Sequence, residues 1–394
     1  MRAVLLLGVL AACPARAPEP AAPVGTGSAP APAPAVIDAA PASQEEQLAA
    51  IQQAMNQLDE AAQACWARAA TERFDIEGEV VATIDIAATA AAATIAHDTT
   101  RNPKLTSCLT RLLGAYRWAP PLHGQTIQLP FKFRAPADGQ NVIDRELVDW
   151  AKQGNVGIAV ELDENNSGNG AASLYEVAIG QGTSTGLRKA ERAELWYLRA
   201  AKPDETAALK VTVTSPSGTL AAGAGDMVFV PAGAVRDVTA QGADLRAVVA
   251  IVPGGREGTA RSGALPTPPA SPPLKPAPPA PVLVRAESVA QTGPAKIFLD
   301  ATKLKTTPLA ASLLTLPEGA QVAEHVHAKE TELLFVLAGS GTMTVNGVAL
   351  AVTPTSVIQI PANTKHAFTA AREVHALQIY TPAGPEQRFK KASK

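Results

Sequence analysis

The chain has 394 residues, and its formal net charge at pH 7 is -2. This balance of charge gives no indication of a nucleic-acid partner, because such partners require a strongly basic surface. The length exceeds that of one ordinary domain and predicts two or three.

The first residues have the features of an export signal, with a signal peptide expected over residues 1–12. Arg2 supplies a positive charge, and the apolar run at residues 3–10 is much shorter than the roughly 20 residues that span a membrane. The run ends in Leu-Ala-Ala-Cys13, which resembles a bacterial lipobox. The resemblance implies cleavage before Cys13, lipidation of Cys13 and, since Pro14 follows, an outer-membrane anchor facing the periplasm. A plain secretory signal that contains a cysteine is the alternative.

Composition predicts how the rest of the chain is divided. Two Pro-rich stretches, 13–43 and 257–282, lack the apolar bulk of a core and predict extended linkers. Three globular regions and a basic tail are expected at residues 44–135, 139–256, 283–384 and 385–394.

The first globular region predicts helices and strands together. Ser43-x-x-Glu46 is a capping box, and apolar residues follow at steps of three and four as far as Cys65. Asn102-Pro103 predicts the start of a second helix, which carries Cys108. Strands are predicted at residues 80–86, which are rich in β-branched side chains, and at residues 127–133.

Cysteine counting predicts one disulfide. If Cys13 is lipidated, Cys65 and Cys108 remain in a compartment that permits disulfides, and a bridge would join the two predicted helices. Two reduced and buried cysteines are the alternative.

Several motifs of this region occur together: Cys65-Trp66, Cys108, Tyr116-x-Trp118-x-Pro120-Pro121 and Leu129-Pro130-Phe131-Lys132-Phe133. With them the region resembles the C-terminal domain of TonB-like proteins, in the variant found in predatory and gliding bacteria. The resemblance implies a small α+β interaction domain that contacts an envelope protein and carries no chemistry. TonB itself has an N-terminal membrane helix, which a lipid anchor would replace here, so a scaffold role is expected rather than energy transduction.

The second and third regions share a weak internal repeat. The segment that starts at Glu194 aligns with the one that starts at Glu332, and Val-Pro-Ala-Gly at 230–233 aligns with Ile-Pro-Ala-Asn at 360–363. Short apolar strands separated by Gly, Pro and Asn-Gly turns predict two all-β sandwiches or barrels. Asn346-Gly347 predicts a two-residue hairpin.

Chemistry concentrates in the stretch EHVHAKETE at residues 324–332. Residues two apart on a strand face the same side, so His325 and His327 can point at one spot. Glu332 enters the next strand, and His366 follows a further apolar strand. Three imidazoles and one carboxylate suit one divalent transition metal (Fe, Mn, Zn, Ni or Cu) and leave positions open, as in catalytic sites. Glu324 and Glu330 are expected to be solvated.

The spacing of these residues is similar to the first motif of cupins. Its fixed positions are Gly319, His325, His327, Glu332 and Gly339. The resemblance implies a cupin barrel, a double-stranded β-helix or jelly roll.

The second cupin motif follows in Pro361-x-Asn363 and His366. Thr355 and Asn363 stand where the motif has glycine, and Asn tolerates a left-handed backbone better than most residues. The resemblance implies that the metal ligands are His325, His327, Glu332 and His366. A cupin that has lost its metal is the alternative.

The other copy of the repeat lacks these ligands. Aligned on Glu194, it has Leu187, Lys189 and Arg236 where the three histidines stand, so a degenerate, metal-free barrel is expected, with ion pairs among its Glu, Lys and Arg. Binding of an anionic ligand by Lys189 and Arg236 is the alternative.

Three further residues of the last strand are candidates to support the metal ligands or contact a substrate: His375, Gln378 and Tyr380. An outward-facing His375 is the alternative.

Two functions compete. A metal-bearing cupin resembles the dioxygenase, decarboxylase and isomerase members of the superfamily, and the apolar residues around the ligands predict an apolar pocket for a small molecule. The alternative is a binding or sensing envelope lipoprotein, in which the TonB-like domain contacts a partner. A purely structural protein with a vestigial site is the third possibility.

Overall fold

The computed structural model describes residues 42–137, 139–265, 267–270, 277–304 and 308–392. Cys13, the signal peptide and nearly all of the first linker lie outside these residues. Contacts divide the described chain into a first unit (residues 42–62, 78–101 and 106–133) and a second unit (residues 63–77, 102–105 and 134–392). Within the described residues, no helix is both long enough and apolar enough to cross a membrane.

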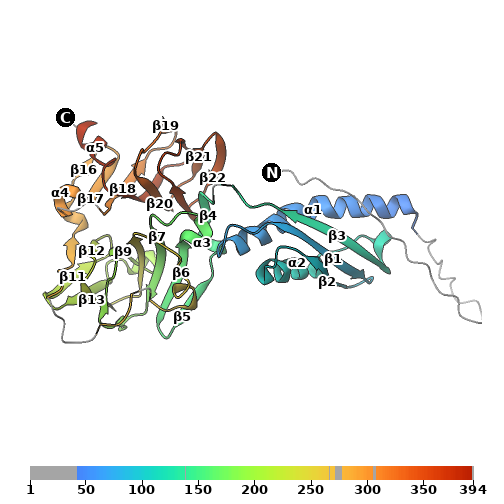
Figure 1. The fold of residues 1–394 in the computed structure, drawn as a ribbon, viewed down its shortest axis with the longest axis horizontal. Coiled ribbons are helices and arrows are strands. Elements are labelled where there is room, and N and C mark those ends of the chain that lie inside the picture. Colours follow the sequence, from blue (N-terminus) through green and yellow to red (C-terminus); the bar gives the residue numbers. More distant parts are fainter. Residues whose placement is uncertain (1–41, 138, 266, 271–276, 305–307, 393–394) are drawn as a thin grey trace, which may run out of the picture. The chain divides into compact units, whose positions relative to one another are not determined.

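The first unit combines helices with one small sheet (Figure 1). Its elements, two of which extend into the second unit, are α1 (Gln44–Ala70), β1 (Gly78–Ile86), β2 (Ala91–Asp98), α2 (Pro103–Ala115), η1 (Pro120–Leu122) and β3 (Gln125–Phe133). The strands pair antiparallel in the order β2-β1-β3. Alternate residues of β1 are fully buried, which identifies one covered face of the sheet.

Both predicted helix starts are confirmed. The Ser43 hydroxyl accepts the Glu46 amide at 3.2 Å, and Glu46 Oε2 accepts the Ser43 amide at 2.7 Å, which is a capping box. Asn102 Oδ1 accepts the Leu105 amide at 3.0 Å, ahead of Pro103 at the first helical position. Cys65 and Cys108 are both disulfide-bonded.

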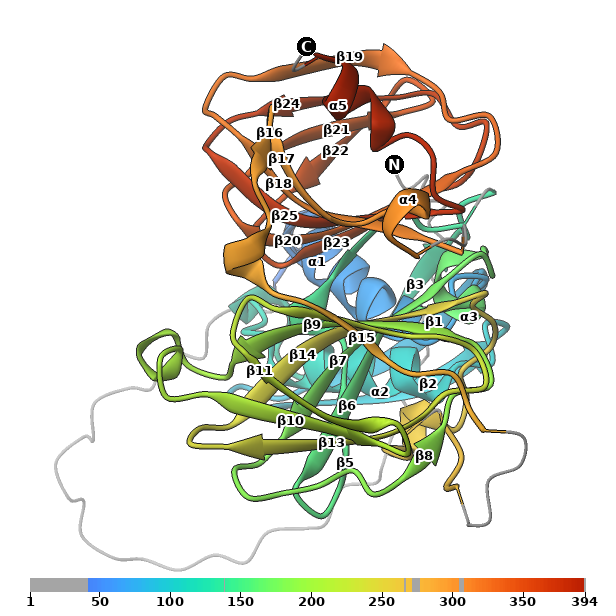
Figure 2. The same ribbon diagram turned by 90° about the vertical axis from the view of Figure 1, so that its left-hand side faces the viewer.

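The second unit contains two β-barrels, each built from a seven-stranded and a four-stranded sheet (Figure 2). The strands between residues 142 and 252 are β4 (Val142–Asp144), β5 (Trp150–Gln153), β6 (Val156–Leu162), β7 (Ser173–Ile179), β8 (Arg188–Lys189), β9 (Ala193–Ala200), β10 (Lys210–Ser215), β11 (Gly218–Gly223), β12 (Met227–Val230), β13 (Val235–Gln241) and β14 (Leu245–Val252). The strands after residue 280 are β15 (Val282–Val284), β16 (Gln291–Thr292), β17 (Ala295–Leu299), β18 (Ala310–Leu316), β19 (Gln321–His325), β20 (Thr331–Ala338), β21 (Gly341–Val345), β22 (Val348–Val352), β23 (Ser356–Ile360), β24 (His366–Ala370) and β25 (Val374–Thr381). Short helices are η2 (Arg145–Leu147), α3 (Glu164–Ser167), η3 (Pro203–Glu205), η4 (Ala260–Ser262), η5 (Ala286–Ser288), α4 (Ala301–Leu304) and α5 (Gln387–Ala392).

The two barrels exchange strands. The first barrel joins β15-β12-β9-β14-β7-β6-β5 to β11-β10-β13-β8, and the second joins β16-β17-β18-β25-β20-β23-β4 to β19-β24-β21-β22. Strand β4 precedes the first barrel yet pairs with β23 of the second, and β15 precedes the second barrel yet pairs with β12 of the first. Each barrel therefore has one sheet edge covered by a strand from outside its own stretch of sequence.

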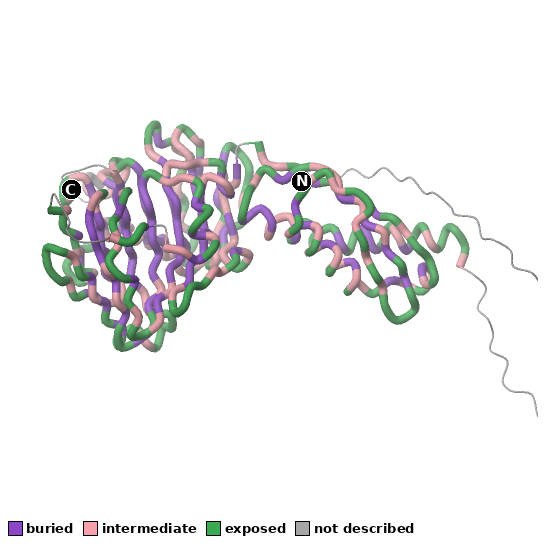
Figure 3. Tube along the Cα trace, turned by 60° about the horizontal axis from the view of Figure 1, so that its bottom comes forward, coloured by how far each residue is buried: buried purple, intermediate pink, exposed green. Residues whose placement is uncertain are grey.

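Many residues of the strands in the second unit are buried (Figure 3), and their apolar side chains form separate clusters. One apolar cluster lies inside the first barrel, and another forms the inner wall of the second. A third cluster joins the outer faces of the two seven-stranded sheets, with Leu195 and Val248 from the first barrel and Leu333 and Leu377 from the second. The barrels are therefore packed sheet on sheet through an apolar interface.

The second expected linker is only partly a linker. Residues 257–265 and 267–270 pack against the first barrel, where Ala260 is fully buried and the Lys189 backbone amide donates to the Pro268 carbonyl at 3.0 Å. The proline content predicted an extended chain that serves as a linker. An extended chain can also lie along the edge of a sheet and form backbone hydrogen bonds with it.

Other local predictions have definite outcomes. Asn346 and Gly347 have φ of 47° and 81° between β21 and β22, which confirms the two-residue hairpin. Asn363 has φ of 62°, so its place in the motif does require a left-handed backbone. The segment 385–394, expected to be a tail, contains the helix α5.

Candidate metal centre

Four residues from three strands and one turn converge at one end of the second barrel. His325 is the last residue of β19 and His366 the first of β24, and the two are direct cross-strand partners. Glu332 is the second residue of β20. His327 lies beyond the end of β19, so it reaches the site from a turn rather than from the strand that its spacing predicted. The position of this turn is fixed by the backbone amide of Asn363, which donates to the His327 carbonyl at 2.7 Å.

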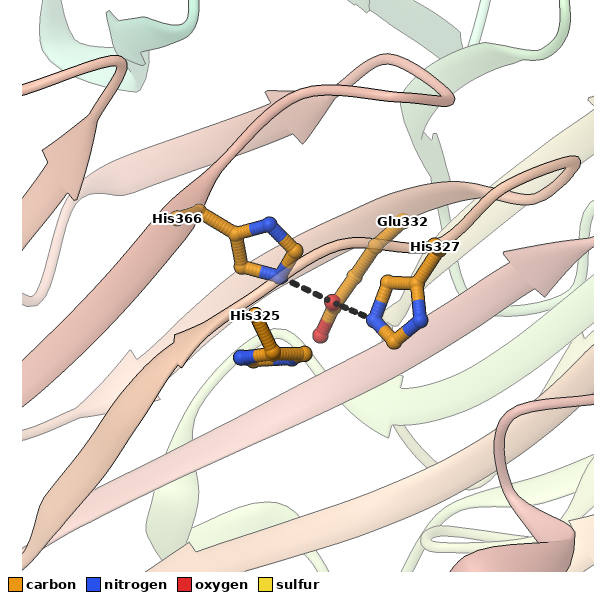
Figure 4. Close-up of side chains that lie close together, drawn as sticks. All are labelled: His325, His327, Glu332 and His366. Atoms are coloured by element: carbon orange, nitrogen blue, oxygen red, sulfur yellow. Dashed lines mark hydrogen bonds and ion pairs between the residues drawn. The ribbon is translucent and has the colours of Figure 1, made fainter.

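The four side chains offer their donor atoms to one point (Figure 4). One ligand atom from each of His325, His327, Glu332 and His366 lies within 4.8 Å of all the others. Glu332 Oε2 is 3.2 Å from His327 Nε2 and 3.3 Å from His366 Nε2. His327, Glu332 and His366 are buried.

The hydrogen bonds of the rings set the tautomers that a metal needs. Nδ1 of His325 lies 2.8 Å from the Ala323 carbonyl, and Nδ1 of His366 lies 2.9 Å from the Thr364 carbonyl. A carbonyl can only accept, so both Nδ1 atoms carry the proton, and in a neutral ring Nε2 then has a free lone pair.

No hydrogen-bond donor of the described residues faces these buried lone pairs. Nε2 of His325 and Nε2 of His366 make no hydrogen bond within the described part of the chain. Nε2 of His366 lies 3.3 Å from Glu332 Oε2 without hydrogen-bond alignment, so this approach is not a hydrogen bond. Burial lowers the pKa of His325, which favours the neutral, metal-binding form of the ring. These atoms fit one divalent metal ion.

Glu332 is held as a carboxylate. Burial alone raises its pKa, but the hydrogen bond with His327 and a hydrogen bond from Gln378 outweigh burial and keep the pKa far below its ordinary value. Gln378 Nε2 donates to Glu332 Oε1 at 2.7 Å, and the Tyr380 hydroxyl donates to the same oxygen at 3.2 Å. Burial and the charge of Glu332 raise the pKa of Tyr380, so its hydroxyl keeps the proton that it donates.

The structure separates the remaining candidates. Gln378 and Tyr380 contact Glu332, whereas His375 lies on the opposite face of β25, where Nε2 is 2.9 Å from Glu373 and the side chain is 45% exposed. Glu324 is exposed and approaches only Lys365, at 4.0 Å. Glu330 hydrogen-bonds the neighbouring Lys329 amide and stays outside the cluster.

A cavity of about 410 Å³ opens beside the cluster inside the second barrel. His325, Glu332 and His366 line one part of it, and most of the remaining wall is aliphatic or aromatic, including Leu334 and Phe368. The predicted apolar pocket is thus present. Two residues that sequence reasoning missed also line it, Arg388 and Phe389 of α5, because a short basic segment near the end of a chain carries no pattern that links it to a distant pocket.

In the first barrel a buried ion pair occupies the equivalent place. Arg236 Nε and Nη2 lie 3.1 and 2.9 Å from Glu194 Oε2, and both side chains are buried. Trp196 Nε1 donates to Glu194 Oε2 at 2.8 Å, and Thr267 Oγ1 donates to Oε1 at 2.7 Å. Lys189 is exposed, so the expected ion pair forms between Glu194 and Arg236 without it.

Comparison with known proteins agrees with this geometry. Residues 312–380 match the cupin domain family. A search of curated proteins finds no match.

Among solved structures, Bacillus subtilis oxalate decarboxylase at pH 4.6 is 15% identical, over 62% of this chain and 77% of its own, with a TM-score of 0.48. The formate complex of Lactobacillus farciminis oxalate decarboxylase is 12% identical, over 62% of this chain and 87% of its own, with a TM-score of 0.49. Mn(II) centres are described for the B. subtilis enzyme. The second barrel of this chain carries a cupin domain whose three histidines and one glutamate could hold one divalent metal.

Proposed function

We propose that this chain is an exported, lipid-anchored cupin protein that binds one divalent transition metal in its second barrel and acts there on a small molecule. One observation carries the proposal. The Nε2 atoms of His325 and His366 are buried without a hydrogen-bond partner among the described residues, and they lie close to the Glu332 carboxylate beside an open cavity. His325, His327, Glu332 and His366 would hold the ion. When bound, such a metal would polarise an oxygen atom of the substrate or bind dioxygen.

The residues of the chain prepare the site for that role. Gln378 and Tyr380 occupy Glu332 Oε1, which leaves Oε2 directed at the imidazoles. The apolar wall lowers the local dielectric and strengthens electrostatic interactions at the polar end.

Metal analysis of protein purified without a His tag tests the proposal. We expect close to one equivalent of metal in the native protein and a loss of most of it in the His325→Ala, His327→Ala double variant. His375→Ala is the matched control, because this histidine of the same barrel lies outside the cavity and should leave the metal content unchanged. Equal metal in the native protein and the double variant would show that these residues are not the ligands.

An enzymatic role is tested by turnover of the metal-loaded protein. Oxygen uptake and product formation should be measured across diketones, flavonols, hydroxy acids and oxalate, with the double variant as the blank. Turnover that disappears in the double variant supports a metalloenzyme of the dioxygenase, decarboxylase or isomerase type.

The second candidate is a non-enzymatic binding or sensing lipoprotein. It is favoured by the first barrel, which we interpret as a degenerate cupin because the Glu194–Arg236 pair replaces the metal. The first unit, as a TonB-like interaction module, would contact an envelope protein. Metal and ligand binding without turnover of any compound in the panel would support this candidate.

The lipid anchor has its own test. Replacing Cys13 by Ser should release the protein from the membrane fraction into the soluble periplasmic fraction. Unchanged membrane association of Cys13→Ser would refute lipidation at this residue.

A further inference from the structure

Among the described residues, the lining of the cavity beside the metal site combines an apolar wall with one arginine. Aliphatic and aromatic side chains of the second barrel form most of the wall, among them Leu314, Val336 and Phe368. The acidic group of the lining is Glu332, which already faces His327 and His366. Arg388 is the cation of the lining and comes from α5 rather than from the barrel.

The structure holds Arg388 at the polar end. Arg388 Nη2 donates to the Tyr380 hydroxyl at 3.1 Å, and that hydroxyl donates to Glu332 Oε1. The helix that carries Arg388 is anchored at buried Asp300, which accepts from Gln387 at 3.2 Å and pairs with Lys390. The guanidinium is therefore kept close to the four candidate metal ligands by its own contact with Tyr380 and by the contacts of Gln387 and Lys390 with Asp300.

Arg388 has no carboxylate partner among the described residues, although its neighbours Gln387 and Lys390 both reach Asp300. A guanidinium has five donors arranged to bind a carboxylate by two parallel hydrogen bonds, and Arg388 uses one toward Tyr380. Donors thus remain for an anion at the cavity.

We propose that the cavity binds a molecule with one carboxylate and an apolar body, with Arg388 pairing the carboxylate and the barrel wall burying the body. This inference rests on the proposed function only for the role of the metal. Binding of the carboxylate molecule to the cavity does not depend on it. A small dianion such as oxalate would leave the apolar wall uncovered and bring two charges into it, which is unfavourable. A volume of about 410 Å³ lies in the range of small-molecule sites.

Equilibrium dialysis with octanoate, hexanoate, 1-octanol and oxalate tests the proposal on the full chain, with and without added Mn²⁺. Octanoate should bind more tightly than hexanoate by roughly fourfold per methylene, and more tightly than 1-octanol or oxalate. Arg388→Gln should weaken octanoate binding by roughly tenfold and leave 1-octanol binding unchanged. Arg388→Lys keeps the charge but not the bidentate geometry, so its affinity for octanoate should lie between that of the native protein and that of Arg388→Gln.

Two controls separate this site from other sites and from the metal proposal. Arg372→Gln removes an exposed arginine of the same barrel that pairs with Glu318, and it should bind octanoate like the native protein. Ala376→Leu places a larger side chain into the cavity from its wall and should abolish octanoate binding while metal content stays native. Metal content is measured for every variant, so loss of metal and loss of octanoate binding are read independently.

Tighter binding of oxalate than of octanoate would overturn the proposal. So would equal octanoate affinity of the native protein and Arg388→Gln, whatever the metal content. If Arg388→Gln fails to fold by circular dichroism, an octanoate affinity of Arg388→Lys equal to the native value would overturn it in the same way.

Discussion

At the scale of single residues, the two barrels show two uses of one carboxylate. Glu332 faces the imidazoles of His327 and His366, and Nε2 of His366 has no hydrogen-bond partner among the described residues, whereas Glu194 is neutralised by Arg236 and two further donors. A buried carboxylate needs hydrogen-bond donors or an opposite charge, and each of the two carboxylates has such partners. The two sites therefore differ in the residues around the glutamate. The second barrel has His325, His327 and His366, and the first barrel has other residues at these positions.

This contrast predicts the effect of breaking the ion pair. Arg236→Ala should lower the free energy of unfolding by about 3–5 kcal/mol, because Glu194 would remain buried without its partner. The double variant Glu194→Gln, Arg236→Met should recover much of the loss, since it removes both charges. Lys189→Ala, at an exposed position, is the control and should change stability by less than about 0.5 kcal/mol. Chemical denaturation followed by tryptophan fluorescence measures all three.

A second buried carboxylate lies on β6. Glu161 is 1% exposed, and neither of its oxygens has a hydrogen-bond partner among the described residues. Burial, followed by the charge of Glu176, raises its pKa well above the ordinary 4.5, and Arg145 opposes the shift only in part. The carboxyl therefore binds its proton more tightly in the folded protein than in the unfolded chain.

This shift predicts a pH-dependent stability. With a raised pKa in the folded state, the contribution of Glu161 to the free energy of unfolding falls as the pH rises from about 4.5 through the folded-state pKa. Glu161→Gln should therefore stabilise the protein at pH 7, on the order of 1–3 kcal/mol, and have little effect at pH 4. Denaturant midpoints at the two pH values measure this, with exposed Glu146→Gln as control. An equal effect of Glu161→Gln at both pH values would contradict it.

At the scale of elements, the exchanged strand β4 joins the barrels. Ile143 of β4 is 3% exposed and belongs to the apolar cluster between the two seven-stranded sheets. The adjacent Arg145 donates to the carbonyls of Val336, Pro354 and Thr355 in the second barrel. Thr355, the departure from the motif glycine, thus has its carbonyl engaged by the exchanged segment.

The exchange predicts that a change before the first barrel destabilises the second. Ile143→Ala should lower the free energy of unfolding of the second unit by about 2–5 kcal/mol, through lost burial and the cavity that remains. Val348→Ala, at a position 60% exposed, is the matched truncation of a β-strand residue and should cost less than about 0.5 kcal/mol. Hydrogen exchange of the β23 amides should rise in Ile143→Ala, and an unchanged β23 would show that the pairing with β4 contributes nothing.

At the scale of the whole molecule, the two disulfide-bonded cysteines belong to different units, Cys65 to the second and Cys108 to the first. Cys65→Ser with Cys108→Ser should lower the free energy of unfolding of the protein by about 2–5 kcal/mol. The metal content of the second barrel should stay native, because no ligand lies on α1 or α2. Chemical denaturation measures the loss of stability, and a parallel loss of metal would contradict the independence of the metal site from these cysteines.

Local patterns predicted much of this molecule. The capping box, the helix start at Pro103, the Asn346-Gly347 hairpin and the left-handed Asn363 depend on neighbours in sequence, so a few residues suffice to specify them. The spacing of His325, His327, Glu332 and His366 predicted residues that the structure does bring together. Strand β2 was not predicted, because its alanine-rich sequence has no period of two in hydrophobicity.

The sequence by itself determined the residues of the candidate metal centre and the presence of two related β-regions, because motif spacing and repeats are properties of the chain order. Only the tertiary structure decided that β4 and β15 are exchanged, that Thr267 completes the Glu194–Arg236 pair, and that Arg388 reaches the cavity. Each of these joins residues far apart in the chain, and such contacts arise from the packing of whole sheets, which no local pattern encodes.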